Sequence, residues 1–404
     1  MKLHLKELLN TPHISFHTPG HKNTAEGDLT ELDYTDNLAS PTGAIKRAQE
    51  DIAKILGASA SFLLTDGSTS GVYAMLYALK EYGATRIAAG ERSHPCVKRG
   101  CELMGLEFVP VPASFDRGTQ PSFSDWVRAL EKADAALVTS PDYYGYFAPL
   151  NELAHWAAEE NKPLLIDGAH GAHLHFTKDY AGRYADLWVD GVHKSLPALT
   201  QGAVVSAKTK EWAERLRRAV AYFRTSSPSY PIMASVEYAV KYPRNEAIER
   251  AAQEAKGALG ALANDDWTKI VIPFGTNTDR AQAALEEAGI YPEFNDGEHL
   301  ALYLSPCTKE EDLYQAVEIL QKIPRGEAVL ARGERVRIPE GATAERVPLS
   351  QAAGRIAAES AGLFPPCVPL FVRGERITAA AVARLAHAKS KFGVDGETLF
   401  VIKE

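Results

Sequence analysis

The stretch SFLLTDGSTSGVYAMLYALKEYGATRIAAGE, residues 61–91, contains a strand, a turn, a helix and the start of a second strand. SFLLT is short and apolar, whereas GVYAMLYALKEYG has its apolar residues at helical spacing and ends on a glycine. RIAAGE then begins another strand-like run. A strand followed by a helix and a second strand is typical of a parallel sheet covered by helices.

The same alternation extends in both directions along the chain, from about residue 45 to residue 205. The further runs are IKRAQEDIAKILG (45–57), AALVTSP (135–141), LNELAHWAAEENK (150–162), PLLIDGAH (163–170) and GAVVSA (202–207). The sequence therefore predicts an α/β fold with a mostly parallel central sheet and helices on both faces. In such folds ligands bind at the C-terminal ends of the strands.

The pattern changes after residue 240. RNEAIERAAQEAKGALGALAND (244–265) predicts a long helical stretch, and shorter strands and helices follow, with a Pro/Gly-marked region from Ile323 to Pro348. We expect three parts: an N-terminal arm (1–44), a large cofactor-binding domain (45–240) and a smaller C-terminal α+β domain (241–404).

Composition excludes several classes of protein. The chain has 404 residues, 45% of them hydrophobic, which is enough to bury a large core. Its net charge of −8 is spread along the sequence, without the Lys/Arg clusters of a protein that binds nucleic acid or anionic membranes. The four cysteines are Cys96, Cys101, Cys307 and Cys367, and they form no C-x-x-C pair. With no apolar segment of membrane-spanning length, we expect a cytoplasmic protein with no membrane or nucleic-acid partner.

A turn rich in small and hydroxyl residues separates the first strand from its helix. It reads Asp66-Gly67-Ser68-Thr69-Ser70-Gly71. Small residues allow backbone N–H groups to approach an anion, and the N-terminus of the following helix favours negative charge. A phosphate-binding turn and an ordinary capped turn explain this stretch equally well, because Ser, Thr and Gly are also common capping residues. The spacing differs from the G-x-x-x-x-G-K-[ST] pattern of nucleotide-binding loops.

Two further strand ends carry charged residues. PLLIDGAH delivers Asp167 at the end of a strand, and ADLWVDGVHK (185–194) leads to Lys194. Taken alone, Asp167 is best explained as a helix-capping residue. Taken with Lys194 it has another use, because an anion stabilises the protonated form of a heterocyclic nitrogen, and a poorly solvated lysine amine is a nucleophile toward a carbonyl. A carboxylate, a lysine and an anion-binding turn are together what pyridoxal phosphate requires.

Histidines near these strand ends allow two interpretations. His94, in ERSHPCVKRG, follows the strand RIAAGE and would place a flat ring against a bound heterocycle, although a lone histidine is more often a core or surface residue. The run HGAHLH, with His170, His173 and His175, invites a metal-binding interpretation. A zinc site would be expected to recruit Cys or carboxylate partners with recognisable spacing, and the local aspartate is better explained by the cofactor. We therefore expect no metal.

These residues lie in stretches that resemble the pyridoxal-phosphate-dependent ornithine/lysine/arginine decarboxylase family, which has the aspartate-aminotransferase fold (fold type I). The match is closest to the shorter arginine-decarboxylase-like members, and HKSLPALTQ and FHTPGHK are its most specific signatures. The matching stretches run through most of the chain: SFHTPGHK, TDGSTSG, SHPCVKRG, IDGAHGAH, VHKSLPALTQGA, RTSSPSY, YPEFNDGEHLALYLSP and VPLSQAAGRIAAESAGLFPPCVPLFVRGE.

The resemblance implies a role for each residue around the ring of the cofactor. Lys194 would hold pyridoxal phosphate as a Schiff base, and Asp167 would bond the pyridine nitrogen. His94 would stack on one face of the ring and Ala169 would pack against the other. His170 would lie near the phenolic oxygen of the ring or near the substrate carboxylate.

The resemblance also implies a phosphate site. The phosphate would be held by Ser68, Thr69 and His193, with Gly67 beside them. The RTSSPSY segment, from the same or a neighbouring subunit, would approach the phosphate through Ser227 and Ser229. Two residues depart from the family pattern: Pro95 follows His94 where many relatives have Lys, and Gly168 replaces an acidic residue common in the D-x-A-H motif.

The implied activity is decarboxylation of a basic amino acid, with arginine favoured over lysine and ornithine, to give CO2 and a polyamine or its precursor. An aminotransferase or another fold type I enzyme is the nearest alternative, since fold and cofactor residues alone do not decide the reaction. A non-catalytic regulatory homologue that binds pyridoxal phosphate is the alternative of another class. The intact Lys194, Asp167 and His94 argue against that last interpretation.

Substrate and subunit contacts complete these expectations. Candidates for the carboxylate that binds the basic group of the substrate are Asp33, Asp36 and Glu359, although each is more often a solvated or capping residue. Active sites of this fold type usually lie at a dimer interface, so the resemblance implies a homodimer. We expect FHTPGHK, with His17 and His21, to lie at the mouth of a site.

Overall fold

A seven-stranded sheet forms the centre of the large domain in this computed structural model, which describes residues 2–9, 11–113, 120–328, 333–339, 341–364 and 368–403. Its order is β1-β7-β6-β5-β4-β2-β3. The strands are β1 (Ala60–Leu64), β2 (Arg86–Gly90), β3 (Glu107–Val111), β4 (Ala135–Thr139), β5 (Leu164–Gly168), β6 (Leu187–Asp190) and β7 (Ala203–Ala207). Neighbouring strands are parallel except where β7 pairs with β1 and β6. The mostly parallel sheet predicted from the sequence is confirmed.

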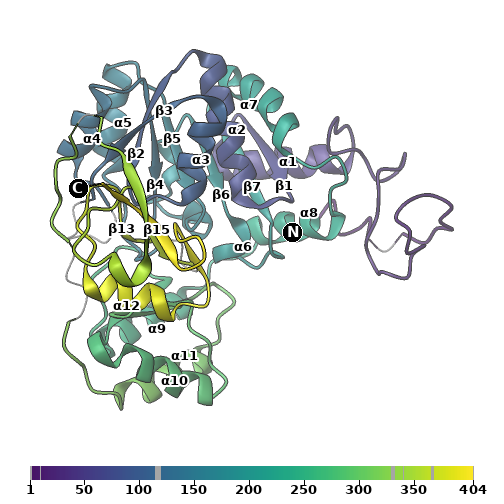
Figure 1. Ribbon diagram of the computed structural model, residues 1–404. Helices are drawn as coiled ribbons and strands as arrows, with labels where there is room; N and C mark the ends of the chain where they lie inside the picture. Colours follow the sequence, from purple (N-terminus) through teal and green to yellow (C-terminus); the bar gives the residue numbers. More distant parts are fainter. Residues whose placement is uncertain are drawn as a thin grey trace.

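Helices cover both faces of this sheet (Figure 1). One face carries α1 (Ala44–Leu56), α4 (Phe123–Leu130), α5 (Leu150–Glu159) and α8 (Tyr230–Val240), and the other carries α2 (Gly67–Tyr82), α3 (Pro95–Met104) and α7 (Lys210–Phe223). Along β4, Val138 packs into the first core and Leu137 into the second. Successive side chains of a strand point to opposite faces, so a strand covered on both sides needs continuous apolar sequence, as in AALVT.

Glycines end α1 and α2 where the sequence predicts. Gly57 and Gly83 have left-handed φ angles of 69° and 109°. The N–H of each donates to carbonyl oxygens in the last turn of its helix, which would otherwise be unpaired. Side chains with a Cβ rarely adopt this conformation, which explains the glycine at both positions.

The C-terminal part contains two further cores. The first is built from α9 (Glu246–Ala258), α10 (Thr278–Glu287), α11 (Glu310–Gln321) and the antiparallel strands β8 (Lys269–Pro273), β9 (Phe294–Asn295) and β10 (His299–Tyr303). The second comes from α12 (Ala379–His387) and the strands β11 (Ala344–Pro348), β12 (Ala361–Leu363), β13 (Pro369–Phe371), β14 (Lys391–Phe392) and β15 (Thr398–Ile402). The predicted smaller α+β domain is confirmed.

One predicted element is shorter in the structure than in the sequence pattern. The helical stretch expected over 244–265 ends at Ala258. Gly260 follows with a left-handed φ of 51°, and the chain then turns toward β8. We propose that the two domains divide near residue 241, because the helices that cover the large sheet end with α8 and α9 begins a separate core.

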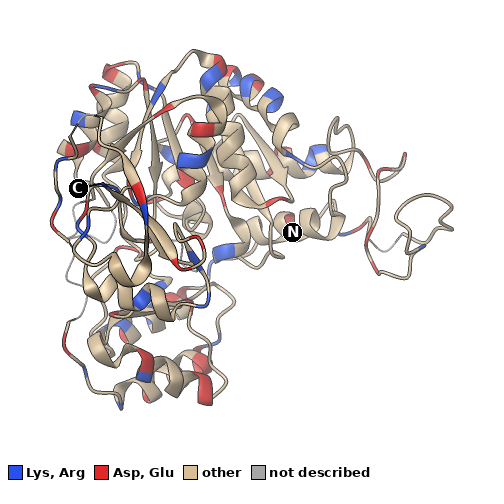
Figure 2. Ribbon diagram, in the orientation of Figure 1, with Lys and Arg blue, Asp and Glu red and all other residues tan. Residues whose placement is uncertain are grey.

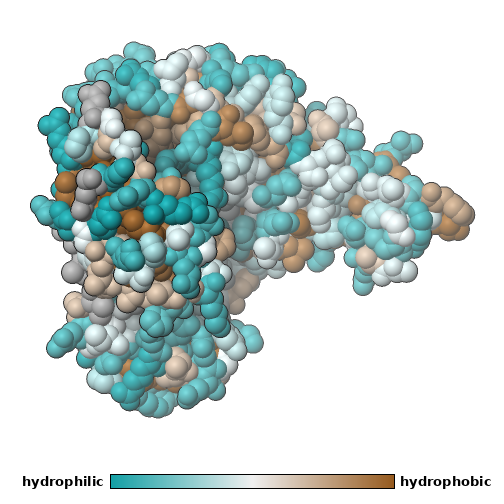
Figure 3. Space-filling view, in the orientation of Figure 1, coloured by the Kyte–Doolittle hydropathy of each residue, from teal (hydrophilic) through white to brown (hydrophobic). Residues whose placement is uncertain are grey.

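The N-terminal arm is anchored at its base and projects from the body. The backbone N–H groups of His4 and Leu5 each donate to the Glu237 carboxylate at 2.8 Å. The Lys241 ammonium donates to Glu237 at 2.9 Å and to Asp51 at 2.7 Å. Beyond this anchor the arm extends away from the rest of the chain (Figure 1) and shows an apolar end in Figure 3.

Charged residues of both signs are interspersed over the surface (Figure 2). Pairs one helical turn apart are common, such as Arg215 with Glu211 and Lys322 with Glu318. Within the described residues, no helix is both long enough and apolar enough to cross a membrane. Among the described residues, Cys96, Cys101 and Cys307 form no disulfide bond. Cys367 lies outside the described residues.

Candidate active site

Two strand ends bring Asp167 and Lys194 to the same cavity. β5 and β6 are parallel neighbours; Asp167 lies near the end of β5, and Lys194 follows β6. A Cβ at Gly191 would lie 2.5 Å from the carbonyl oxygen of Ala169, so glycine is needed where the chain leaves β6 and passes the end of β5. The short helix α6 (Val192–Ser195) then places Lys194 Nζ 3.2 Å from His170 Nε2.

Asp167 is a buried carboxylate, 3% exposed. Burial raises its pKa, while the positive charge of Lys194 and the N–H of Ala169, 3.1 Å from Asp167 Oδ1, act in the opposite direction. An ionised carboxylate is unfavourable in such a place unless a cation lies nearby. A protonated heterocycle in the cavity would therefore stabilise the Asp167 anion and be stabilised by it.

Three histidines around Lys194 are held in their neutral forms. Burial, followed by the positive charges of Lys194 and Arg99, lowers the pKa of His94 to about 4. Burial also lowers the pKa of His170 well below its ordinary value, and the charge of Lys194 adds to this effect. Burial lowers the pKa of His193, although a hydrogen bond from its Nδ1 to a backbone carbonyl opposes the shift. Neutral rings can stack on a heterocycle without adding charge.

Hydrogen bonds fix which nitrogen of His193 carries the proton. Its Nδ1 lies 3.0 Å from the carbonyl oxygen of Gly202 and therefore donates to it. Nε2 is left as an acceptor at the cavity that His193 lines. The N–H of Gly67 donates in turn to the carbonyl oxygen of Gln201 at 2.9 Å, so the turn after β1 and the segment after α6 lie side by side.

A cavity of about 240 Å³ lies between these elements. It is bounded by the N-terminus of α2, where Gly67 has a left-handed φ of 76°, and by the ends of β4 and β5. Its lining residues are Gly67, Ser68, Thr69, His94, Cys96, Thr139, Tyr143, Asp167, Ala169, His170, His193, Lys194, Thr200 and Gln201. Nine of these are residues that the resemblance assigns to the cofactor, whereas the two remaining candidates, Ser227 and Ser229, do not line the cavity.

Unpaired polar atoms show what this cavity can bind. Within the described part of the chain, Thr139 Oγ1 and His170 Nδ1 are buried without a hydrogen-bond partner, and both residues line the cavity. Such atoms are unfavourable unless a ligand pairs with them. Pyridoxal phosphate fits the donors and acceptors present: a carboxylate for its ring nitrogen, an imidazole for its phenolic oxygen, and a helix N-terminus with hydroxyls for its phosphate.

A second cavity, of about 600 Å³, opens outward from the same lysine. It shares His94, Tyr143, His170, His193 and Lys194 with the first cavity. Its outer wall comes from the C-terminal part of the chain: Glu293, Tyr303, Leu304, Ser305, Thr308 and Phe364. A small molecule in this cavity would lie between the two domains, with one end at Lys194.

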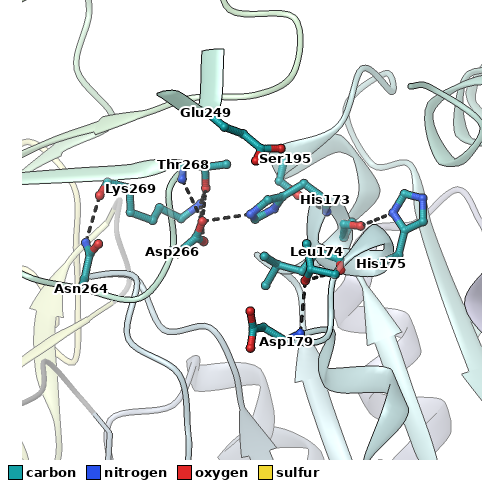
Figure 4. Close-up of polar contacts among 12 residues, drawn as sticks. His173, Leu174, His175, Asp179, Ser195, Glu249, Asn264, Asp266, Thr268 and Lys269 are labelled. Carbon is teal, nitrogen blue, oxygen red and sulfur yellow. Dashed lines mark hydrogen bonds and ion pairs between the residues drawn. The ribbon is translucent and has the colours of Figure 1, made fainter. Parts of the chain in front are cut away.

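A buried polar network ties the C-terminal part to the segment that follows β5 (Figure 4). His173 Nε2 lies 2.9 Å from Asp266 Oδ1, which also accepts hydrogen bonds from the N–H and hydroxyl of Thr268. Lys269 Nζ donates to Thr268 Oγ1 at 3.0 Å and lies 4.1 Å from the centre of the Tyr303 ring. Burial alone would raise the pKa of Asp266, but the charges of His173 and Lys269 hold it well below its ordinary value.

The remaining candidates from the sequence do not line either cavity. The Asp36 carboxylate accepts hydrogen bonds from the N–H groups of Thr42, Gly43 and Ile45, so it caps the start of α1 as its simpler interpretation predicts. Asp33 is exposed, and Glu359 lines a different cavity.

The RTSSPSY segment approaches the turn after β1 from within the same chain. The N–H of Thr225 donates to Asp66 at 3.2 Å. Ser229 is the N-cap of α8, and Ser227 is exposed. His17 and His21 lie on the projecting arm, outside the lining of both cavities, so the expectation that FHTPGHK lies at the mouth of a site is not met within one chain.

The two departures from the family pattern have local explanations. Pro95 occupies the first turn of α3, where a missing N–H is tolerated, and His94 Nδ1 caps that helix by accepting from the N–H of Cys96 at 3.2 Å. A Cβ at Gly168 would lie 3.0 Å from the carbonyl oxygen of Val189 and 3.2 Å from Asp190 Oδ1. An acidic side chain there would crowd an aspartate already in place.

Sequence reasoning missed several lining residues. Thr200 and Gln201 stand in a quoted motif without being singled out, and Tyr143 follows β4 at the same edge of the sheet as Asp167. The rule that ligands bind at strand ends would have found Tyr143. Glu293 and Tyr303 belong to a quoted stretch, but only the docking of the C-terminal part brings them to Lys194.

Most of the chain is similar to known proteins. Residues 115–265 match the model of the Orn/Lys/Arg decarboxylase major domain, and residues 321–393 match the model of the Orn/Lys/Arg decarboxylase C-terminal domain. The uncharacterized protein YaaO of Bacillus subtilis is 30% identical, over 92% of this chain and 90% of that protein. The arginine decarboxylase of the same organism is 26% identical, over 93% and 90%.

Solved structures show the same fold. The Francisella novicida lysine decarboxylase LdcF matches with a TM-score of 0.74 at 16% identity, over 100% of this chain and 81% of that one. The Escherichia coli constitutive lysine decarboxylase matches with a TM-score of 0.72 at 18% identity, over 99% and 81%. The expected fold type is thereby confirmed.

Proposed function

This chain belongs to the Orn/Lys/Arg decarboxylase family, and we propose that it removes the α-carboxylate of a basic amino acid as CO2. The observation that carries the proposal is the contact between Lys194 and His170 beside the buried Asp167. We favour arginine over lysine and ornithine. Relatives named arginine decarboxylase match 89–97% of this chain, whereas the E. coli lysine decarboxylase matches 57%.

The cofactor of the proposed reaction is pyridoxal phosphate. When bound, it supplies an electron sink for the electron pair left as the bond between Cα and the carboxylate breaks. Lys194 would hold its aldehyde carbon, and Asp167 its ring nitrogen in the protonated state. His94 and Ala169 would enclose the two faces of the ring, and His170 would donate to the phenolic oxygen.

The phosphate would lie at the N-terminus of α2. Gly67, Ser68 and Thr69 provide backbone and hydroxyl donors there, and the helix dipole favours the anion. His193 Nε2 is an acceptor when the ring is neutral, because Nδ1 carries the proton, so it would face a protonated phosphate oxygen or a hydroxyl donor. The tautomer of His193 therefore determines which groups of the phosphate it can pair with.

Each turnover consumes one proton, which must reach Cα where the carboxylate has left. Lys194 Nζ is suited to deliver it, because Lys194 lines both cavities and its Nζ contacts His170 Nε2 at 3.2 Å. His193 is the second candidate. A substrate bound in the larger cavity, between the two domains, would displace water from these contacts.

The direct test is release of CO2 by the purified protein with pyridoxal phosphate and arginine, lysine or ornithine in turn. The amine product is identified by mass. We expect agmatine from arginine at a higher kcat/KM than cadaverine from lysine or putrescine from ornithine. A Lys194→Ala variant serves as the control for background decarboxylation by the free cofactor.

Two outcomes would contradict the proposal. Formation of a keto acid, dependent on an added amino-group acceptor, would show the aminotransferase alternative. Binding of pyridoxal phosphate without any product from the three amino acids would favour the non-catalytic alternative.

We further propose a homodimer in the cytoplasm. Ile14 and Phe16 on the projecting arm are 85% and 94% exposed, which is unusual for large apolar side chains and is explained if the arm packs on a second copy. Light scattering would then give about twice the chain mass of 43.9 kDa. His17→Ala and His21→Ala variants with unchanged turnover would show that the arm does not reach a partner's site.

A further inference from the structure

Glu293 stands out in the outer wall of the larger cavity. Of the residues that line it, Glu293 is the one that carries a carboxylate. The lysine and the histidines that line it, Lys194 and His170 among them, are at the inner end where the cofactor would lie. A basic amino acid bound with its α-amine at Lys194 would point its distal cation outward, toward a wall with a single negative charge.

The backbone directs the Glu293 side chain into this cavity. Glu293 directly precedes β9, and its N–H donates to the carbonyl oxygen of Ala301 on β10 at 2.9 Å. The next residue, Phe294, is 4% exposed and packs its ring edge-on against Tyr144 and Tyr303. Because successive side chains along extended chain point to opposite sides, a buried Phe294 places Glu293 on the cavity side.

Lys269, a buried cation near Glu293, has other partners. Lys269 lies close enough for the charge of Glu293 to raise its pKa, against the larger lowering effect of burial. Its amino group nevertheless contacts Thr268, Asp266 and the face of Tyr303. Within the described residues, Glu293 makes no side-chain hydrogen bond and no ion pair. Its carboxylate is thus available to a ligand.

The walls between the two ends suit the apolar stem of such a substrate. Tyr303 and Tyr143 flank His170 with their rings at 5.8 and 4.8 Å between centres. Phe364, from the C-terminal part, is 55% exposed at the opening. The methylene groups of the substrate, between its α-amine at Lys194 and its distal cation at Glu293, would pack against these rings.

We propose that Glu293 binds the distal guanidinium or ammonium group of the substrate and thereby selects basic amino acids. This inference rests on the proposed function and deepens it by naming the residue that reads the side chain. Glu293 then takes the role of the substrate-binding carboxylate, for which Asp33, Asp36 and Glu359 were the candidates from the sequence. A neutral amino acid of the same shape would make no charge-assisted hydrogen bond to this carboxylate and would bind more weakly.

The test compares Glu293→Gln with the wild type, both loaded with pyridoxal phosphate. Glutamine keeps the size of the side chain and removes its charge. The matched control is Glu287→Gln, which removes one charge from the exposed end of α10 in the same domain. Each protein is assayed with the preferred basic substrate and its neutral counterpart: arginine with citrulline, lysine with norleucine, ornithine with norvaline.

For Glu293→Gln we expect kcat/KM for the basic substrate to fall about 10- to 100-fold, mainly through KM, since a hydrogen bond to a charged group is lost. The preference for the basic over the neutral substrate should narrow by a similar factor. Glu287→Gln should stay within about twofold of the wild type. A Glu293→Gln variant with unchanged KM and unchanged preference would overturn the inference.

A binding measurement separates this inference from the proposed function. If the wild type releases no CO2, arginine is titrated calorimetrically into the loaded wild type and Glu293→Gln, and Kd takes the place of KM. Weaker binding to the variant would support the role of Glu293 while the proposed reaction fails. Equal binding to both proteins, or no binding of any basic amino acid to the wild type, would overturn it.

Discussion

The two halves of the candidate site are held in different ways. The cofactor half consists of Asp167, His170, His193 and Lys194, and its residues stand within a few positions of the ends of β5 and β6. The substrate half consists of Glu293 and the residues of the C-terminal part around it, and reaches Lys194 only because that part docks on the large domain. Local backbone geometry positions the first half, and tertiary packing positions the second.

This difference explains what each half needs in order to work. Buried groups in the cofactor half have shifted pKa values, so their charge states depend on one another and on the ligand. The Glu293 side chain is more exposed than these groups and pairs with no cation in the described residues, which leaves it able to bind a charged substrate. Changes in the cofactor half should therefore affect chemistry, changes in the docking network should affect stability, and changes outside both should affect neither strongly.

The largest effect is expected from the network that docks the two parts. Asp266→Asn removes the charge that faces His173 and Lys269, and leaving one partner of a buried ion pair uncompensated lowers the free energy of unfolding by about 3–5 kcal/mol. Denaturant unfolding measures the change. A loss below about 1 kcal/mol would mean that the network does not hold the C-terminal part in place.

The next effect concerns chemistry in the cofactor half. Asp167→Asn removes the anion beside the ring nitrogen and should lower kcat about 10²- to 10³-fold, the range for loss of one preorganised electrostatic group. Asp186→Asn is the matched control, because Asp186 directly precedes β6, at the opposite edge of the sheet from Asp167, and its carboxylate accepts from the N–H of Leu164. Equal kcat values in the two variants would contradict the role of Asp167.

A pH dependence of stability follows from His94. Its pKa is about 4 in the folded protein, against an ordinary value of 6.5, so the unfolded chain binds the proton first. Stability should therefore fall as the pH drops from about 6.5 to 4, by at most about 3 kcal/mol. His94→Asn keeps a helix-capping side chain and should show a flatter pH profile of unfolding. Superimposable profiles would show that His94 is not buried in this way.

The smallest effect is expected outside the site, at Asp36. Asp36→Asn preserves a side chain that tolerates the left-handed φ of 75°, but it removes the charge at the start of α1. The free energy of unfolding should fall by about 1 kcal/mol, with kcat and KM unchanged. A selective rise of KM for basic substrates would indicate that Asp36 binds the substrate, and would weaken the assignment of Glu293.

The contrast between the halves also explains how much of the fold and the site can be predicted from the sequence alone. The alternating pattern from residue 45 to 205 and the glycines after α1 and α2 are local signals, and they predict the sheet, its helices and the strand ends that carry Asp167 and Lys194. The end of α9 at Ala258 was missed, because alanines and leucines continue the helical pattern past the glycine that ends it.

Glu293 shows the limit more clearly. In the sequence it is one acidic residue among many, and its value arises from three facts that no local pattern contains: the burial of Phe294 beside it, the pairing of β9 with β10, and the docking through Asp266. Asp36 shows the converse, since eight residues after it, at Ala44, the chain begins a helix that uses its carboxylate as a cap.

The central claim is that Lys194 is the residue that holds pyridoxal phosphate. It is tested by adding the cofactor to the full-length protein, reducing with borohydride and locating the modified lysine by peptide mass spectrometry. We expect the adduct on the peptide that contains Lys194, and its absence from that peptide in Lys194→Ala. Stoichiometric modification of another lysine, such as the buried Lys269 beside Tyr303, with Lys194 unmodified, would contradict the account of both halves.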